Sequence, residues 1–155
     1  MVALFLSVIL SGCVTRRSMV SQECKQQPLI DLAGSRVVIF PENVGAVDGY
    51  GGGEVLSFWT PTYSDVARVE PALRQYLKLT APQLEARLAE YRRQYSGFVY
   101  GGKRLIYVNF LCGDSSSYDW QCGPIFVDDG GDCFFHLECD LDSSSCSKLW
   151  INGNA

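Results

Sequence analysis

The side chains best suited to chemistry in this chain are a single histidine, His136, and seven cysteines. A histidine titrates near neutral pH and can act as a general base toward a serine hydroxyl. The serine-rich segment Ser115, Ser116 and Ser117 would offer such a hydroxyl. The pattern singles out no nucleophile, and a lone histidine near Glu138 on a strand is typical of a cross-strand surface pair. We therefore expect no catalytic residue, with a small envelope hydrolase using His136 and a loop serine as the alternative.

The first cysteine, Cys13, follows a short apolar run at residues 2–10. The run has the length of the apolar part of a secretory signal peptide and is too short to span a bilayer. The residues Leu10-Ser11-Gly12-Cys13 resemble the lipobox of bacterial lipoproteins, although no Lys or Arg precedes the run. The resemblance implies that residues 1–12 are a cleaved signal peptide, that Cys13 carries a diacylglycerol thioether, and that the new amino terminus is acylated.

The same resemblance implies a location. Val14 and Thr15 follow the cysteine in place of the aspartate that retains lipoproteins in the inner membrane, so the outer membrane, facing the periplasm, is favoured. Residues 13–28 are polar and are expected to form a lipidated tether, with a single domain at residues 29–155. The expected partners are the membrane, through the lipid on Cys13, and a periplasmic protein.

Setting Cys13 aside leaves an even number of cysteines, which an exported chain usually oxidises to disulfides. The remaining cysteines are Cys24, Cys112, Cys122, Cys133, Cys139 and Cys146. Cys139 and Cys146 flank a turn-rich segment between two predicted strands, so we expect them to pair across that hairpin. Cys112 is then expected to join Cys122 or Cys133, with Cys24 attaching the tether to the domain.

Composition excludes several classes of protein. The 155 residues carry a net charge of −4, which argues against a nucleic-acid partner because such proteins gather a basic surplus. Hydrophobic residues make up 47% of the chain, enough for a real core. A zinc site is not expected, because there is no Cys-x-x-Cys pair and one histidine. The acidic residues near Asp140 lack the spacing of an EF-hand, so no metal or cofactor is expected.

The elements that must position these residues indicate an α+β fold. We expect a strand at residues 36–40, another within 54–59, a helix capped by Thr62 or Ser64, and a second helix after Thr80 that exposes Arg92 and Arg93. After Gly97, apolar residues recur with a period of two, which is typical of strands. A hairpin is expected around Gly101-Gly102, with strands at 98–100 and 103–112, followed by strands at 125–127, 133–139 and near 149–151. The prediction is two helices packed on one face of a four- to five-stranded antiparallel sheet, braced by disulfides.

Alternation along the later strands assigns their faces. Cys133, Phe135, Leu137 and Cys139 are expected to face inward, with His136 and its neighbours Phe134 and Glu138 facing outward. Leu149 and Ile151 are expected on the inner face of the last strand.

Three aromatic residues, Tyr50, Tyr118 and Trp120, lie in or beside loops. Trp and Tyr on loops of a rigid scaffold are favoured recognition residues, so we expect these three to bind a partner. The alternative is that the rings fold back on the edge of the core, which is the role expected for Trp59. With no catalytic set in view, the sequence favours a non-enzymatic binding module of the inhibitor, immunity or assembly type.

From about Trp59 onward the layout resembles a group of small bacterial exported proteins that have no assigned activity. Four short motifs carry this resemblance: Phe58-Trp59-Thr60-Pro61, Tyr91-Arg92-Arg93-Gln94-Tyr95, Val127-Asp128-Asp129-Gly130-Gly131 and Leu149-Trp150-Ile151-Asn152-Gly153. The resemblance implies no catalytic residue.

Overall fold

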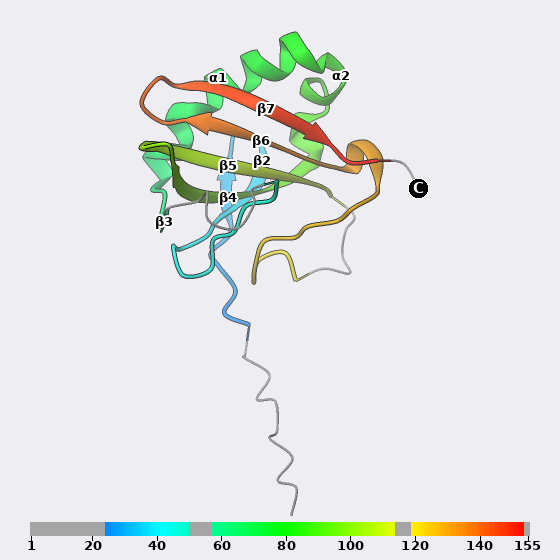
Figure 1. Ribbon diagram of the computed structural model, residues 1–155. Coiled ribbons are helices and arrows are strands. Elements are labelled where there is room, and N and C mark those ends of the chain that lie inside the picture. Colours follow the sequence, from blue (N-terminus) through cyan, green and yellow to red (C-terminus); the bar gives the residue numbers. More distant parts are fainter. Residues whose placement is uncertain (1–23, 50–56, 114–118, 154–155) are drawn as a thin grey trace, which may run out of the picture.

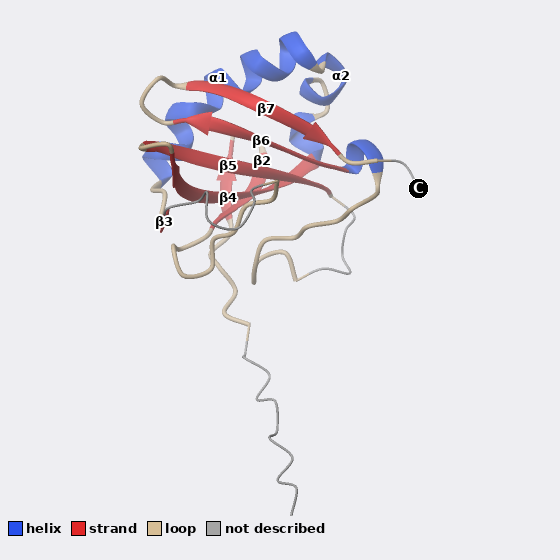
Figure 2. Ribbon diagram, viewed as in Figure 1, coloured by secondary structure: helices blue, strands red, loops and turns tan. Residues whose placement is uncertain are grey.

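The computed structural model describes residues 24–49, 57–113 and 119–153. These residues build a mixed α/β fold with one seven-stranded sheet, helices on one face of it and three disulfides. Figure 2 shows the helices on one side of the sheet and the longer loops on the other. The strands are β1 (Ile30–Leu32), β2 (Ser35–Ile39), β3 (Ser57–Trp59), β4 (Tyr91–Tyr100), β5 (Lys103–Cys112), β6 (Phe134–Asp140) and β7 (Ser145–Ile151). The helices are α1 (Tyr63–Thr80) and α2 (Pro82–Glu85), with 3-10 turns at Leu88–Glu90 and Gly131–Cys133.

The sheet is larger than predicted and is not purely antiparallel. Its strands run in the order β1-β2-β4-β5-β6-β7, and β3 pairs with β4 on the same edge as β2 (Figure 1). β2 and β4 are parallel, and the other pairs are antiparallel. The chain leaves β2, crosses through α1 and returns in β4, and such a crossover allows parallel pairing. The three-residue strand β1 is too short to show a clear period in the sequence.

Helix α1 begins at the predicted cap. Thr62 accepts a hydrogen bond from the backbone N of Asp65 at 3.2 Å, and its own backbone N donates to Asp65 Oδ2 at 2.9 Å, which is a reciprocal capping box. The helix continues through the exposed Pro71 to Thr80. Its apolar stripe packs on the sheet through Val66, Val69, Leu73 and Leu77.

The second predicted helix is wrong. Residues 82–85 form one short helical turn, and β4 begins at Tyr91. Tyr91, Arg93 and Tyr95 alternate along β4 and are buried on the face that α1 covers. The apolar spacing fitted either element, and pairing with β5 along the whole of β4 decides for the strand. Arg93 is therefore fully buried, not on an exposed helix face as expected.

The later part of the chain follows the prediction more closely. The β4–β5 hairpin is confirmed, and Gly101 and Gly102 take φ values of +55° and +75°, as a two-residue turn of this type requires. Residues 125–127 form a loop, not the predicted strand, because they lie across the sheet face and not along an edge. Cys133 ends a 3-10 turn, so β6 starts one residue later than expected.

Candidate functional site

The sheet face opposite α1 carries an open groove beside β7, called here the β7 groove. It consists of two adjoining hollows of about 300 and 360 Å³. Both hollows are lined by Asp48, Gly49, His136 and Trp150. The other described residues that line them are Val127, Asp128, Glu138, Lys148, Leu149 and Asn152.

Strands β6 and β7 supply one side of the β7 groove. Phe135 and Leu137 pack in the main core, so His136 between them lies on the opposite face of β6. Trp150 is the register partner of His136 on β7 and is 64% exposed. A register shift between His136 and Glu138, with a φ of +52° at Lys148, marks a bulge next to this pair. Such bulges re-aim the side chains that follow them.

A loop after β2 supplies the opposite side through Asp48. The loop turns sharply at its start, where the backbone N atoms of Val44 and Gly45 both donate to the Pro41 carbonyl at 2.9 Å. Asp48 is exposed, and its Oδ1 accepts a hydrogen bond from the Gly49 backbone N at 2.8 Å. The carboxylate is therefore held at the groove by a loop that is itself tied down.

The second loop of the groove is held by two buried amides, Gln94 and Asn109. Asn109 Nδ2 donates to the Ile125 carbonyl at 2.6 Å and to Gln94 Oε1 at 3.0 Å. Gln94 Oε1 also accepts from the Ile125 backbone N at 2.9 Å, and Asn152 Nδ2 donates to the Val127 carbonyl. Neither Gln94 nor Asn109 was predicted from the sequence to lie at a site. The signal was present, since extending the Gly101-Gly102 hairpin register pairs Gln94 with Asn109 inside otherwise apolar strands.

His136 is half-buried and its ring lies 4.9 Å from the ring of Tyr107, centroid to centroid. Burial lowers the pKa of His136 below its ordinary value, and the nearby Asp48 carboxylate partly opposes this effect. The imidazole is therefore neutral at neutral pH, with one nitrogen able to donate a hydrogen bond and the other to accept one.

The lowered pKa of His136 makes a prediction about stability. The unfolded chain binds a proton to this histidine at a higher pH than the folded chain does, so acid favours unfolding. We expect its stabilising contribution to be present above the unfolded pKa and to be lost as the pH falls through the folded pKa. His136→Asn should remove this part of the pH dependence. Urea denaturation of both proteins near pH 7 and near pH 5 measures it. Parallel pH profiles would contradict the assignment.

The charges at the β7 groove are unequally paired. Glu138, expected to face outward, lines the groove but is only 5% exposed, and its Oε1 lies 3.4 Å from Lys148 Nζ. Asp48 and Asp128 are both exposed. Within residues 24–49, 57–113 and 119–153, no Lys or Arg forms an ion pair with either of them. Among the described residues, the rim of the groove therefore carries two carboxylates that have no ion-pair partner.

Trp120, one of the aromatic residues predicted to bind a partner, does not line the β7 groove. Trp120 is only 7% exposed and packs against Val38, Phe40 and Leu111, so its ring folds back on the core, which is the alternative given for it above. The guanidinium of Arg92 lies 5.4 Å from its ring centroid. Trp59 packs against the main core as expected.

Several predicted site residues lie outside the described residues. They are Cys13, Tyr50, Ser115, Ser116, Ser117 and Tyr118. Among the described residues, Trp150 is an exposed aromatic that lines the β7 groove, and it was not among the residues predicted to bind a partner. Ile151 is the register partner of Phe135, so it lies on the inner face as expected, and it is 39% exposed at the edge strand of the sheet.

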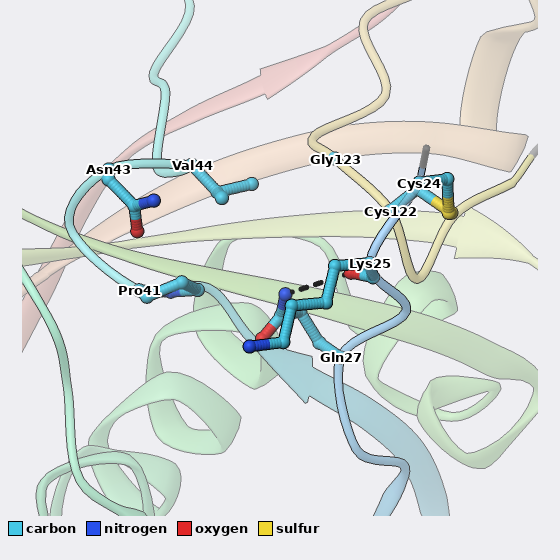
Figure 3. Close-up of a pocket in the computed structure, with 8 residues that line it drawn as sticks. All are labelled: Cys24, Lys25, Gln27, Pro41, Asn43, Val44, Cys122 and Gly123. Carbon is cyan, nitrogen blue, oxygen red and sulfur yellow. Dashed lines mark hydrogen bonds between the residues drawn. A yellow bond between two sulfur atoms is a disulfide. The ribbon is translucent and has the colours of Figure 1, made fainter. Parts of the chain in front are cut away.

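A larger cavity of about 830 Å³ lies near the start of the described chain (Figure 3). Residues 24–27, 41–44 and 122–123 supply its lining, and the Cys24–Cys122 disulfide closes one side. Gln27 Nε2 donates to the Lys25 carbonyl at 3.0 Å, so part of the polar lining is engaged within the segment itself. Among the described residues of this lining, Lys25 is the one with an ionisable side chain. This N-terminal cavity therefore offers fewer groups to a ligand than the β7 groove.

The disulfides settle the alternatives left open by the sequence. The structure pairs Cys139 with Cys146, as expected, and their Cα atoms lie 4.0 Å apart. Cys112 joins Cys133, and Cys24 joins Cys122. Together these bonds indicate an oxidising, extracytoplasmic environment.

The chain matches no protein-family model, no curated protein and no solved structure. No helix formed by the described residues has both the length and the apolar character needed to cross a membrane. In the same part of the chain, no group of three or more His, Cys, Asp or Glu side chains is arranged to hold a metal ion.

Proposed function

We propose that this protein is a lipid-anchored lipoprotein of the bacterial outer membrane that binds an envelope protein from the periplasmic side without catalysing a reaction. The observation that carries the binding role is the β7 groove, where the exposed indole of Trp150 stands beside two carboxylates and a neutral imidazole. Exposed Trp residues next to hydrogen-bonding groups are frequent anchors of protein interfaces.

The scaffold around the groove supports recognition by a preformed surface. The Cys139–Cys146 bond joins β6 to β7, the two strands that carry His136 and Trp150. On the other side of the groove, Gln94 and Asn109 of the sheet hold the loop at residues 125–127 through hydrogen bonds to the Ile125 backbone. A site held in its binding conformation loses less conformational entropy when a partner binds.

The anchored location rests on the sequence. The Leu10-Ser11-Gly12-Cys13 segment supplies the lipobox resemblance, and the disulfides agree with an exported chain. Several acyl chains on Cys13 exceed the two signals that stable membrane anchoring requires. The partner would then meet the domain close to the membrane.

Site-specific crosslinking in cells tests the binding role. The photoreactive residue p-benzoylphenylalanine replaces Phe126, which is 45% exposed and belongs to the loop that borders the groove. The control position is Leu79, which is 75% exposed near the end of α1. We expect one defined envelope protein to crosslink from position 126 and not from position 79. Adding Trp150→Ala should reduce that product about tenfold or more. Equal products from both positions would contradict the proposal.

The alternative function is a small envelope hydrolase in which His136 acts as the general base. The neutral imidazole in the groove favours this candidate, since only the neutral form accepts a proton. A hydrolytic activity of the purified protein that is lost in His136→Ala, with an unchanged circular dichroism spectrum, would decide for the hydrolase.

The lipid anchor makes a separate prediction. Cys13→Ala is expected to abolish incorporation of labelled palmitate and retention in the membrane fraction, while the domain stays folded. The reason is that the lipid is attached outside the packed domain at residues 29–155. Labelling, fractionation and near-ultraviolet circular dichroism measure the three outcomes. Wild-type protein found soluble in the cytoplasm with an unmodified Cys13 would contradict the anchor.

A further inference from the structure

We infer that the β7 groove receives a cationic side chain of the protein partner, an arginine in preference to a lysine, between the carboxylates of Asp48 and Asp128 and beside the indole of Trp150. This inference rests on the proposed function and names the chemistry that its site selects. It is carried by charge, by the exposed aromatic ring and by the shape of the groove.

The charge of the groove favours a cation. Asp48 and Asp128 stand at the rim without an ion-pair partner among the described residues. Lys148, the basic residue of the lining, is already engaged, with its Nζ 3.4 Å from Glu138 Oε1 and 5.2 Å from the ring centroid of Tyr100. His136 is uncharged at neutral pH because burial lowers its pKa, so it does not repel a cation.

The aromatic ring favours a guanidinium. Trp150 is 64% exposed, although the exposure of a large apolar ring to water is energetically unfavourable. A guanidinium stacks on an indole face and at the same time donates parallel hydrogen bonds to a carboxylate. An ammonium group offers one point charge and no planar face, so the groove distinguishes the two cations.

Two adjoining hollows of about 300 and 360 Å³ leave room for one extended side chain and its neighbours. Both hollows share Asp48, His136 and Trp150, and Asp128 lines the hollow of about 360 Å³, so the arginine that meets both carboxylates enters that one. The opening lies at β7, the last strand of the sheet, where a segment of a partner can approach without displacing another strand.

Nuclear magnetic resonance titration of the mature, oxidised chain tests the inference. The probes are a blocked glycyl-arginyl-glycine peptide, its neutral citrulline analogue, its lysine analogue and a neutral chitin disaccharide. The indole N–H resonance of Trp150, assigned by its loss in Trp150→Phe, reports binding. We expect saturable shifts with the arginine peptide and at least about tenfold weaker binding of the citrulline peptide. Asp48→Asn with Asp128→Asn should weaken arginine binding by about tenfold, and Asp142→Asn, in the β6–β7 turn, should leave it unchanged.

Each other outcome overturns the inference. Equal binding of the arginine and citrulline peptides would show that charge does not drive binding. Tighter binding of the lysine peptide would show that the groove does not select a guanidinium. Binding of the disaccharide alone assigns the groove to a glycan. An absence of any shift removes the groove as a cation site. The proposed function fails on a different result, the absence of a defined crosslinked protein from position 126, so the two failures are distinguishable.

Discussion

Glu70→Ala is expected to lower the free energy of unfolding by about 3–5 kcal/mol, because it leaves a buried guanidinium without its counter-ion. Arg93 is completely buried between α1 and β4, and its Nη1 lies 2.9 and 2.8 Å from the two carboxylate oxygens of Glu70. Nη2 donates to Ser35 Oγ at 2.9 Å. Burial raises the pKa of Tyr95 to about 12, so the neighbouring phenol stays neutral and offers no second anion. Urea denaturation followed by circular dichroism measures the loss.

A matched surface pair provides the control. Glu85 lies 3.7 Å from Arg74 on partly exposed side chains, so Glu85→Ala should cost less than about 1 kcal/mol. Joint replacement of Glu70 by Leu and Arg93 by Met should recover most of the stability, since a buried ion pair replaced by apolar residues is often neutral. Equal losses for Glu70→Ala and Glu85→Ala would mean that the buried pair does not hold α1 to the sheet.

The second large effect is expected from the Cys24–Cys122 disulfide. This bond closes a separation of 98 residues, against 7 residues for Cys139–Cys146. Constraint of the unfolded chain grows with loop length, to about 4.7 kcal/mol for a loop of about 100 residues and about 2–3 kcal/mol for the short hairpin. Replacing both members of each pair by Ser should therefore destabilise the protein more at Cys24–Cys122 than at Cys139–Cys146.

Thermal and urea denaturation of the two double variants under oxidising conditions measure this ranking. The Cys112–Cys133 pair, separated by 21 residues, should fall between the other two. A larger loss from removing the Cys139–Cys146 bond would show that strand register and not chain entropy dominates, because that bond joins β6 directly to β7.

The sequence predicted local structure well where a short motif strongly favours one conformation. The capping box at Thr62, the Gly101-Gly102 turn and the Cys139–Cys146 hairpin are all of this kind. It failed at β4, where aromatic and arginine side chains fit a helix by spacing but were drawn into the sheet by long-range pairing with β5. The parallel pairing of β2 with β4 also depends on long-range contacts and could not be predicted from the local sequence.

The candidate site was likewise predicted where local pattern decides and missed where the fold decides. Alternation placed His136 off the core face correctly, but nothing local brings Asp48 to it, because the two are joined only through the fold. Trp120 looked exposed among polar neighbours and is buried by a loop that Gln94 holds down. Trp150 lies outward between Leu149 and Ile151, as their expected inner positions imply, but nothing local places it beside Asp48.

The central claim is that the β7 groove is where this protein meets its partner. Amide hydrogen exchange of the mature, oxidised chain, with and without the protein captured from position 126, measures this most directly. We predict that protection appears in β7 around Trp150, in the loop that carries Asp48 and in residues 125–129, and does not appear on α1. Protection on α1, or around Lys25 and Asn43 at the N-terminal cavity with β7 unchanged, would contradict the account.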